Sequence, residues 1–174
     1  KVHNILFDNI RATVPKDNIC MFITGAGQSR PEQITFSNID ITFTGGGTAE
    51  QGARRDVPDL ERDYPEIFMF GELPAYGLYM HHAAGIVLNN VQFRLETEDL
   101  RPAIVCDDVQ DLELAGFKAD GNKKAESLIR LQNCQNVFIK GSRPLNEIGM
   151  FLLVEGSTSK DIMLSENKLN LAQN

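Results

Sequence analysis

Apolar and polar positions follow one pattern that the chain repeats along its length. Residues 33–39 (QITFSNI) place apolar side chains at alternate positions and then take a two-residue polar step. Residues 4–10 (NILFDNI) and 85–91 (GIVLNNV) repeat it, and looser copies follow at Leu112, Val137 and Ile162. The first apolar positions are 5, 34, 86, 112, 137 and 162, so the intervals are 29, 52, 26, 25 and 25. Because 52 is twice 26, this fixed period predicts a solenoid.

Each copy has the two-residue alternation of a β-strand, and its apolar residues are mostly β-branched or aromatic. A second apolar run precedes most copies by about nine residues, at residues 78–80, 103–105, 127–129 and 151–154. Two or three short strands in each period of about 25 residues predict an all-β fold, a parallel β-helix. A leucine-rich repeat is the main alternative, but the chain lacks both its leucine-rich consensus and its helical segment.

Asparagine occupies the polar step of three copies, as Asn9, Asn38 and Asn90. Asparagine tolerates left-handed backbone, so we expect these residues at corners between strands. Amides that stack at the same corner of successive coils form a ladder of hydrogen bonds. We therefore expect Asn38 at an inner corner of the solenoid, with its amide hydrogen-bonded.

The doubled interval indicates an insertion at about residues 45–75 of a single domain that spans residues 1–174. The insertion opens with three glycines, and residues 56–61 (DVPDLE) predict a short helix with proline in its first turn. We expect Phe68, Phe70 and Leu73 to pack the insertion against the coils. Its arginines are expected to stay in solvent.

The first copy starts almost at the first residue, with no terminal unit that shields the core of the solenoid. This start predicts a β-helix that is truncated at its N-terminal end. An open strand edge above an apolar core is a template for pairing with another chain. The isolated chain is therefore expected to self-associate through its N-terminal coil.

Composition narrows the possible partners. The net charge of −7 and the pI of about 5.0 argue against nucleic acid or an anionic membrane surface. No apolar run approaches the roughly 18 residues that span a bilayer. Cys20, Cys106 and Cys134 lack the spacing of a metal site, and apolar runs around two of them predict buried free thiols. We expect no metal site.

Five segments together carry a likeness to a known family: residues 20–25 (CMFITG), 33–39 (QITFSNI), 45–48 (GGGT), 69–77 (MFGELPAYG) and 101–109 (RPAIVCDDV). They resemble the C-terminal coils of glycoside hydrolase family 28 proteins, the polygalacturonase and rhamnogalacturonase group, of Bacteroides type. The resemblance implies a right-handed parallel β-helix and hydrolysis of pectic polysaccharide with inversion. It also implies a secreted, periplasmic or cell-surface location and no metal or organic cofactor.

The family's catalytic motifs are Asn-Thr-Asp, an Asp-Asp pair before Cys, Gly-His-Gly and Arg-x-Lys, in that order. The first, third and fourth do not occur in this sequence. Asp107-Asp108 follows Cys106 instead of preceding a cysteine, so the family's catalytic role is not carried onto it. No catalytic residue is assigned, and the family's order would place the machinery upstream of Lys1. The segment alone is expected to be inactive.

Seven residues are candidates for substrate binding. Arginine guanidinium groups suit bidentate binding of uronate carboxylates, and tyrosine rings offer a stacking face to a sugar. A histidine that lies one coil before an aspartate pairs with it or binds a sugar hydroxyl. Each group also has a structural interpretation, as part of a solvated loop, an anchor for the insertion or a polar ladder. The candidates are Arg54, Arg55, Arg62, Tyr64, His81, His82 and Asp107.

The leading interpretation is the C-terminal part of a pectin-degrading glycoside hydrolase that acts on galacturonic-acid-containing polysaccharide, such as pectin or rhamnogalacturonan. These coils would then form one wall of its substrate cleft. Two alternatives remain. One is a non-enzymatic carbohydrate-binding or structural β-helix module of a cell-surface protein, and the other is a stand-alone enzyme with an unrecognised pair of carboxylates.

Overall fold

The computed structural model describes residues 2–14, 20–27, 29–60 and 67–173, and only the backbone of residues 67 and 68. Within these ranges there are one short α-helix, α1 (Ala49–Gly52), and one 3-10 helix, η1 (Ile67–Phe70). The other elements are strands: β1 (His3–Val14), β2 (Met21–Thr24), β3 (Glu32–Phe43), β4 (Leu78–Leu95), β5 (Ile104–Ala115), β6 (Lys118–Ala119), β7 (Ile129–Gln132), β8 (Gln135–Lys140), β9 (Arg143–Pro144), β10 (Leu152–Glu155) and β11 (Lys160–Ser165).

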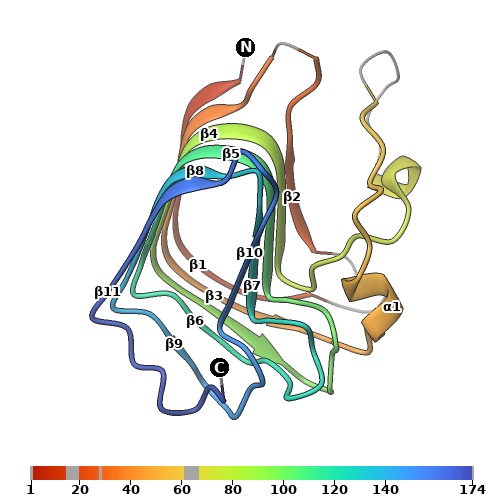
Figure 1. Cartoon of the computed structure of the whole chain (residues 1–174), viewed down its shortest axis with the longest axis vertical. Helices are drawn as coiled ribbons and strands as arrows, with labels where there is room; N and C mark the ends of the chain where they lie inside the picture. The colour runs from red at the N-terminus through yellow and green to blue at the C-terminus, as the bar shows by residue number, and fades with distance from the viewer. Residues whose placement is uncertain (1, 15–19, 28, 61–66, 174) are drawn as a thin grey trace.

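The strands pair in parallel, coil upon coil (Figure 1). The first apolar positions of the repeats stand in register, in the order Ile5, Ile34, Ile86, Leu112, Val137 and Ile162. Six coils are therefore stacked in the described part of the chain. The fold is a parallel β-helix, and the repeat predicted from the sequence is the stacking repeat of the structure.

Three faces form the wall of the solenoid. The first face contains β2, β7, β10 and the first residues of β4 and β5. The second contains β8, β11, the beginnings of β1 and β3, the middle of β4 and the end of β5. The third contains β6, β9 and the ends of β1, β3 and β4. Residues with positive φ mark the corners between the faces, as predicted for Asn9, Asn38 and Asn90.

Alternate residues of the strands point into one continuous apolar core. Ile34 and Phe36 are 4% and 6% exposed, which confirms their predicted burial. Inside the third face, Phe93 makes edge-to-face contacts with Phe43 and Phe117, with centroid distances of 5.5 and 5.3 Å. Aromatic rings of successive coils thus pack edge to face within the core.

The asparagine ladder forms, but on the outside of the solenoid. Asn38 has φ 54° and is exposed, so the expectation of an inner corner was wrong. Its Oδ1 accepts a hydrogen bond from Asn90 at 2.9 Å, and its Nδ2 donates to Asp8 at 3.3 Å. The amide is therefore satisfied as predicted, in contact with solvent.

The insertion leaves the solenoid between β3 and β4, which pair directly with each other. That pairing explains the doubled interval. The inserted chain lies against the outside of the first face, where Phe70 and Leu73 pack with Phe22, Tyr79 and Val105 (Figure 1). The predicted packing is thus confirmed for Phe70 and Leu73, and the side chain of Phe68 lies outside the described residues.

The short helix of the insertion does not lie where the sequence analysis placed it. Residues 56–60 are not helical, and residue 61 lies outside the described ranges. Helix α1 begins after Thr48 because the Thr48 hydroxyl accepts from the Gln51 backbone and the Gln51 side chain accepts from the Thr48 backbone. This reciprocal capping box was the sequence signal for the helix.

A buried ion pair fixes the start of the insertion. Asp99 and Arg101 are 1% and 2% exposed, with Arg101 Nη2 2.8 Å from Asp99 Oδ2. The same carboxylate accepts a hydrogen bond from the Gly47 backbone at 2.9 Å. A Cβ atom at Gly47 would lie 2.1 Å from Arg101 Nε, so this close approach requires glycine.

Candidate functional site

A strip of polar side chains runs along the outside of the first face. Every second residue of a β-strand points to the same side of the sheet. The outward positions at the ends of these strands are in register from coil to coil and about 4.8 Å apart. They hold Thr24, His81, Asp107, Gln132 and Glu155, which we call the polar strip.

Histidine and aspartate pair at the strip and at the neighbouring corner. His81 is in register with Asp107, as predicted, and its Nε2 lies 3.9 Å from Asp107 Oδ2. At the corner, His82 Nδ1 lies 2.6 Å from Asp108 Oδ2, and Arg30 donates to the same oxygen at 2.7 Å. Asp108 therefore has two partners within the chain. The side chains of His81 and Asp107 are 18% and 22% exposed, so they are reachable from solvent.

Asp107 has an altered acidity. Burial raises the pKa of its carboxyl group, and the nearby His81 opposes this shift. Glu155 lies two coils along the strip, roughly 10 Å away, close to the carboxylate separation of inverting glycosidases. However, Glu155 Oε1 is 2.8 Å from Arg55 Nε in an ion pair. These two carboxylates are therefore not the free acid and free base that inversion requires.

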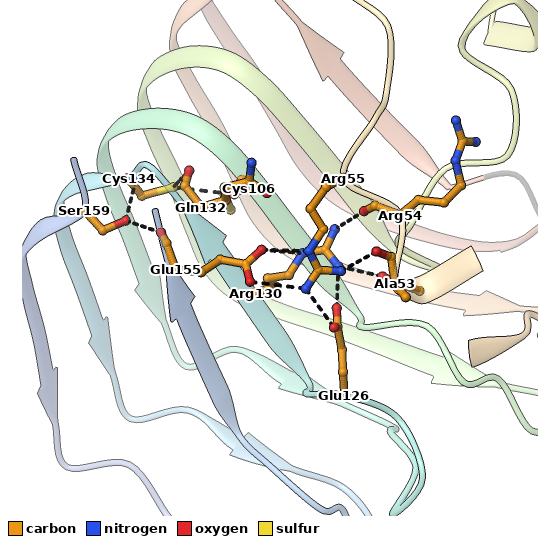
Figure 2. Close-up of polar contacts among 11 residues, drawn as sticks. Ala53, Arg54, Arg55, Cys106, Glu126, Arg130, Gln132, Cys134, Glu155 and Ser159 are labelled. Carbon is orange, nitrogen blue, oxygen red and sulfur yellow. Dashed lines mark hydrogen bonds and ion pairs between the residues drawn. The ribbon is translucent and has the colours of Figure 1, made fainter. Parts of the chain in front are cut away.

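The arginine at position 55 points from the insertion toward the coils (Figure 2). Its Nη2 donates to Glu126 at 2.9 Å and its Nε donates to Glu155 at 2.8 Å. Its Nη1 donates to the carbonyl oxygen of Ala53. Most N–H groups of Arg55 are thus used within the chain.

Arg130 on β7 lies beneath this contact and is 1% exposed. It donates to the carbonyl oxygens of Gly52 and Arg54, at 2.6 and 2.8 Å, and forms an ion pair with Glu126 (Figure 2). Burial lowers the pKa of its guanidinium group, and Glu126 opposes the shift. These contacts therefore fasten the insertion to β7 and β10. We call the four residues that make them the arginine latch: Arg55, Glu126, Arg130 and Glu155.

The arginines of the insertion were expected to stay in solvent, and the structure bears this out in part, because Arg55 is exposed and Arg54 is half-buried. The side chains of Arg54 and Arg55 are 26% and 32% exposed. Arg54 Nε is 3.2 Å from Asp56 Oδ1, and Arg54 also donates to the carbonyl oxygen of Glu72. Carboxylates on the coils and in the insertion itself attract these guanidinium groups, so the arginines hold the insertion in place.

Sequence reasoning did not single out Arg130. It occupies the outward position that holds Tyr79 and Val105 in the two preceding coils. A charged residue in an otherwise apolar row was the available signal, because a buried charge requires partners. Those partners come from the insertion, so no spacing rule identifies them.

The remaining candidates give a mixed result. Arg62 and Tyr64 lie outside the described residues. In the described ranges, no group of three or more histidine, cysteine, aspartate or glutamate residues is placed to hold a metal ion. Cys20, Cys106 and Cys134 are buried free thiols, as predicted, and burial raises the pKa of Cys20 to about 12.

Comparison with protein-family models, with curated proteins and with solved structures gave no match for this chain. The chain is therefore classified by its architecture alone. It is a parallel β-helix, and its first face carries the polar strip and the insertion. None of the helices in the described ranges has the length and apolar character needed to cross a membrane.

Proposed function

We propose that this chain is the polysaccharide-binding C-terminal part of a pectin-degrading glycoside hydrolase, with the catalytic carboxylates outside this segment. The polar strip is the observation that carries the proposal. Hydrogen-bonding side chains in register, about 4.8 Å apart, offer repeated contacts to an extended ligand that lies along the solenoid axis.

Three residues of the strip have a role in this proposal. His81 and Gln132 bind sugar hydroxyl groups, because imidazole and amide groups both donate and accept hydrogen bonds. Asp107 lies between them in the strip. Burial raises the pKa of the Asp107 carboxyl group, and His81, which lies 3.9 Å away, opposes this shift. The insertion borders the strip, where its Arg55 forms an ion pair with Glu155.

A non-enzymatic carbohydrate-binding module is the second candidate function. The ion pair between Glu155 and Arg55 counts against a stand-alone enzyme that uses the carboxylates of the strip, and it is compatible with this module as well as with the leading proposal. Both functions place the protein where polysaccharide is found, in a secreted, periplasmic or cell-surface location. They differ in whether the complete protein cleaves the glycan.

The experiment is calorimetric titration of the chain with oligosaccharides of polygalacturonate and rhamnogalacturonan. His81→Ala combined with Gln132→Ala is expected to lower the affinity about tenfold or more, because two hydrogen-bonding groups are lost. The control is Asn170→Ala, which removes an exposed amide at the other end of the chain. Equal affinity of the double variant and the unaltered protein would contradict the proposal. Reducing-sugar release by the chain itself would contradict the placement of the catalytic groups elsewhere.

A further inference from the structure

A groove lies outside the corner between the second and third faces, away from the polar strip. It has a volume of about 470 Å³. Four successive coils supply its lining, which is Asn9, Ile10, Arg11, Asn38, Ile39, Asp40, Asn90, Gln92 and Lys118. Most of these residues carry amide or charged groups, so the groove suits a polar ligand that extends along the solenoid.

The asparagine ladder forms one side of this groove. Asn9, Asn38 and Asn90 occupy the same corner of successive coils and share left-handed backbone. Asn90 donates to Asn38, and Asn38 donates to Asp8. An amide has two N–H groups and an oxygen with two lone pairs. Each exposed amide therefore keeps hydrogen-bonding capacity for a ligand.

The other side of the groove is a row of outward residues two positions after each corner. Register places Arg11, Asp40, Gln92, Lys118 and Arg143 side by side on successive coils. The backbone of Lys168 continues the row, because its N–H donates to Ser142 just as the N–H of Arg143 donates to Phe117. The row thus ends in three consecutive cations, Lys118, Arg143 and Lys168.

These three cations differ from the other charges of the row. Asp40 lies 3.6 Å from both Arg11 and Arg94 and so compensates part of their charge. Lys118, Arg143 and Lys168 make no ion pair with any residue of the described ranges. Backbone positions in register on neighbouring coils are about 4.8 Å apart, so the like charges of these side chains repel each other. A bound anion relieves that repulsion. The row is thus a local cationic patch on a protein whose net charge is −7.

We propose that the groove and its cationic row bind an anionic oligosaccharide, carboxylated or sulfated, with its acid groups on Lys118 and Arg143 and its hydroxyl groups on the amides of Asn90 and Gln92. One feature favours a sugar over a nucleic acid. The groove lining contains no aromatic side chain for base stacking. The site lies on a different face from the polar strip and does not depend on it.

The test titrates the chain with trigalacturonate, its methyl ester, a sulfated galactan trisaccharide, inorganic sulfate and a short single-stranded DNA. The variant is Lys118→Gln combined with Arg143→Gln. The matched control is Lys124→Gln combined with Lys160→Gln, which removes two exposed lysine charges elsewhere. The proposal expects at least tenfold weaker binding of the acidic trisaccharide by the first variant, with a weaker salt dependence, and no change in the control. The tighter of the carboxylated and sulfated ligands identifies the acid group.

Three results would overturn the proposal. The first is that neither acidic trisaccharide binds, and the second is that the groove variant binds as well as the control. The third is that the methyl ester, inorganic sulfate or DNA binds as tightly as the acidic sugar, which would indicate that the groove does not select an acidic sugar. His81→Ala with Gln132→Ala separates the two proposals, because it affects the strip and leaves the groove intact.

Discussion

Replacement of Arg130 by methionine tests whether the arginine latch holds the insertion on the coils. Methionine keeps most of the length of the side chain but removes its donors. The carbonyl oxygens of Gly52 and Arg54 then lose charge-assisted hydrogen bonds. Glu126 and Glu155 keep Arg55 as their partner, so no carboxylate of the latch is left alone.

The magnitude follows from these losses. Removing one partner of a buried pair costs about 3–5 kcal/mol when it leaves an uncompensated buried charge. Here the two glutamates are 25% and 31% exposed and remain paired, so the cost should be smaller. Stranded acceptors cost about 1–3 kcal/mol each, and methionine avoids the desolvation of a charge. We therefore expect a net loss of about 2 kcal/mol, most of it in the attachment of the insertion.

Chymotrypsin measures this attachment through its cleavage after Phe70, because Phe70 is 2% exposed and becomes accessible only when the insertion opens. When opening and closing are fast, cleavage follows the population of the open form. A loss of about 2 kcal/mol raises that population roughly 30-fold. Arg143→Met is the control, because Arg143 is exposed and its removal should change stability by less than about 0.5 kcal/mol. Equal cleavage rates for Arg130→Met and the control would refute the latch.

Three further predictions concern the solenoid itself. Asn38→Ala is expected to destabilise by about 1 kcal/mol and Asn38→Gly by less, because only the alanine is strained at φ 54°; equal unfolding midpoints would contradict this. Asp107→Asn is expected to stabilise the protein at pH 7, since the raised pKa makes the ionised form unfavourable in the fold. That gain should vanish as the pH falls below the ordinary value of 3.8, and a gain that persists there would contradict it. Phe93→Ala should cost about 3–5 kcal/mol by chemical denaturation, and more than Phe36→Ala, because Phe93 is fully buried and Phe36 is 6% exposed.

The fold could be predicted from the sequence because residues that contact each other on neighbouring coils of a solenoid recur at a fixed spacing along the chain. Ile5, Ile34 and Ile86 were identified by spacing alone, and the structure pairs them in register. Local signals were less reliable where two of them competed. The proline at the start of residues 56–61 suggested a helix there, but the capping box of Thr48 and Gln51 placed it earlier. The strands β6 and β9 have two residues each, too few for a periodic pattern.

The candidate site was predictable only where it depends on the period. His81 and Asp107 are one period apart, so their pairing followed from the repeat. Arg55 and Glu155 are 100 residues apart, and their contact depends on the path of the insertion. That path is set by the packing of Phe70 and Leu73 and by the buried pair of Asp99 and Arg101. Contacts of this kind do not recur at a fixed spacing, so the sequence pattern does not predict them.

The residues that line the groove could be predicted from the sequence. The prediction depends on how a corner changes the alternation of inward and outward residues along a strand. Ile34 and Phe36 point inward and so does Ile39, three positions later instead of two. A step of three leaves two consecutive residues outside, which places Asn38 on the surface rather than at an inner corner. The alternation then restarts, so the residue two positions after each corner must also point outward. Applied to every coil, this count gives Arg11, Asp40, Gln92, Lys118, Arg143 and Lys168. The cationic row could therefore be predicted from the position of each corner within the repeat. The length of the repeat alone does not predict it.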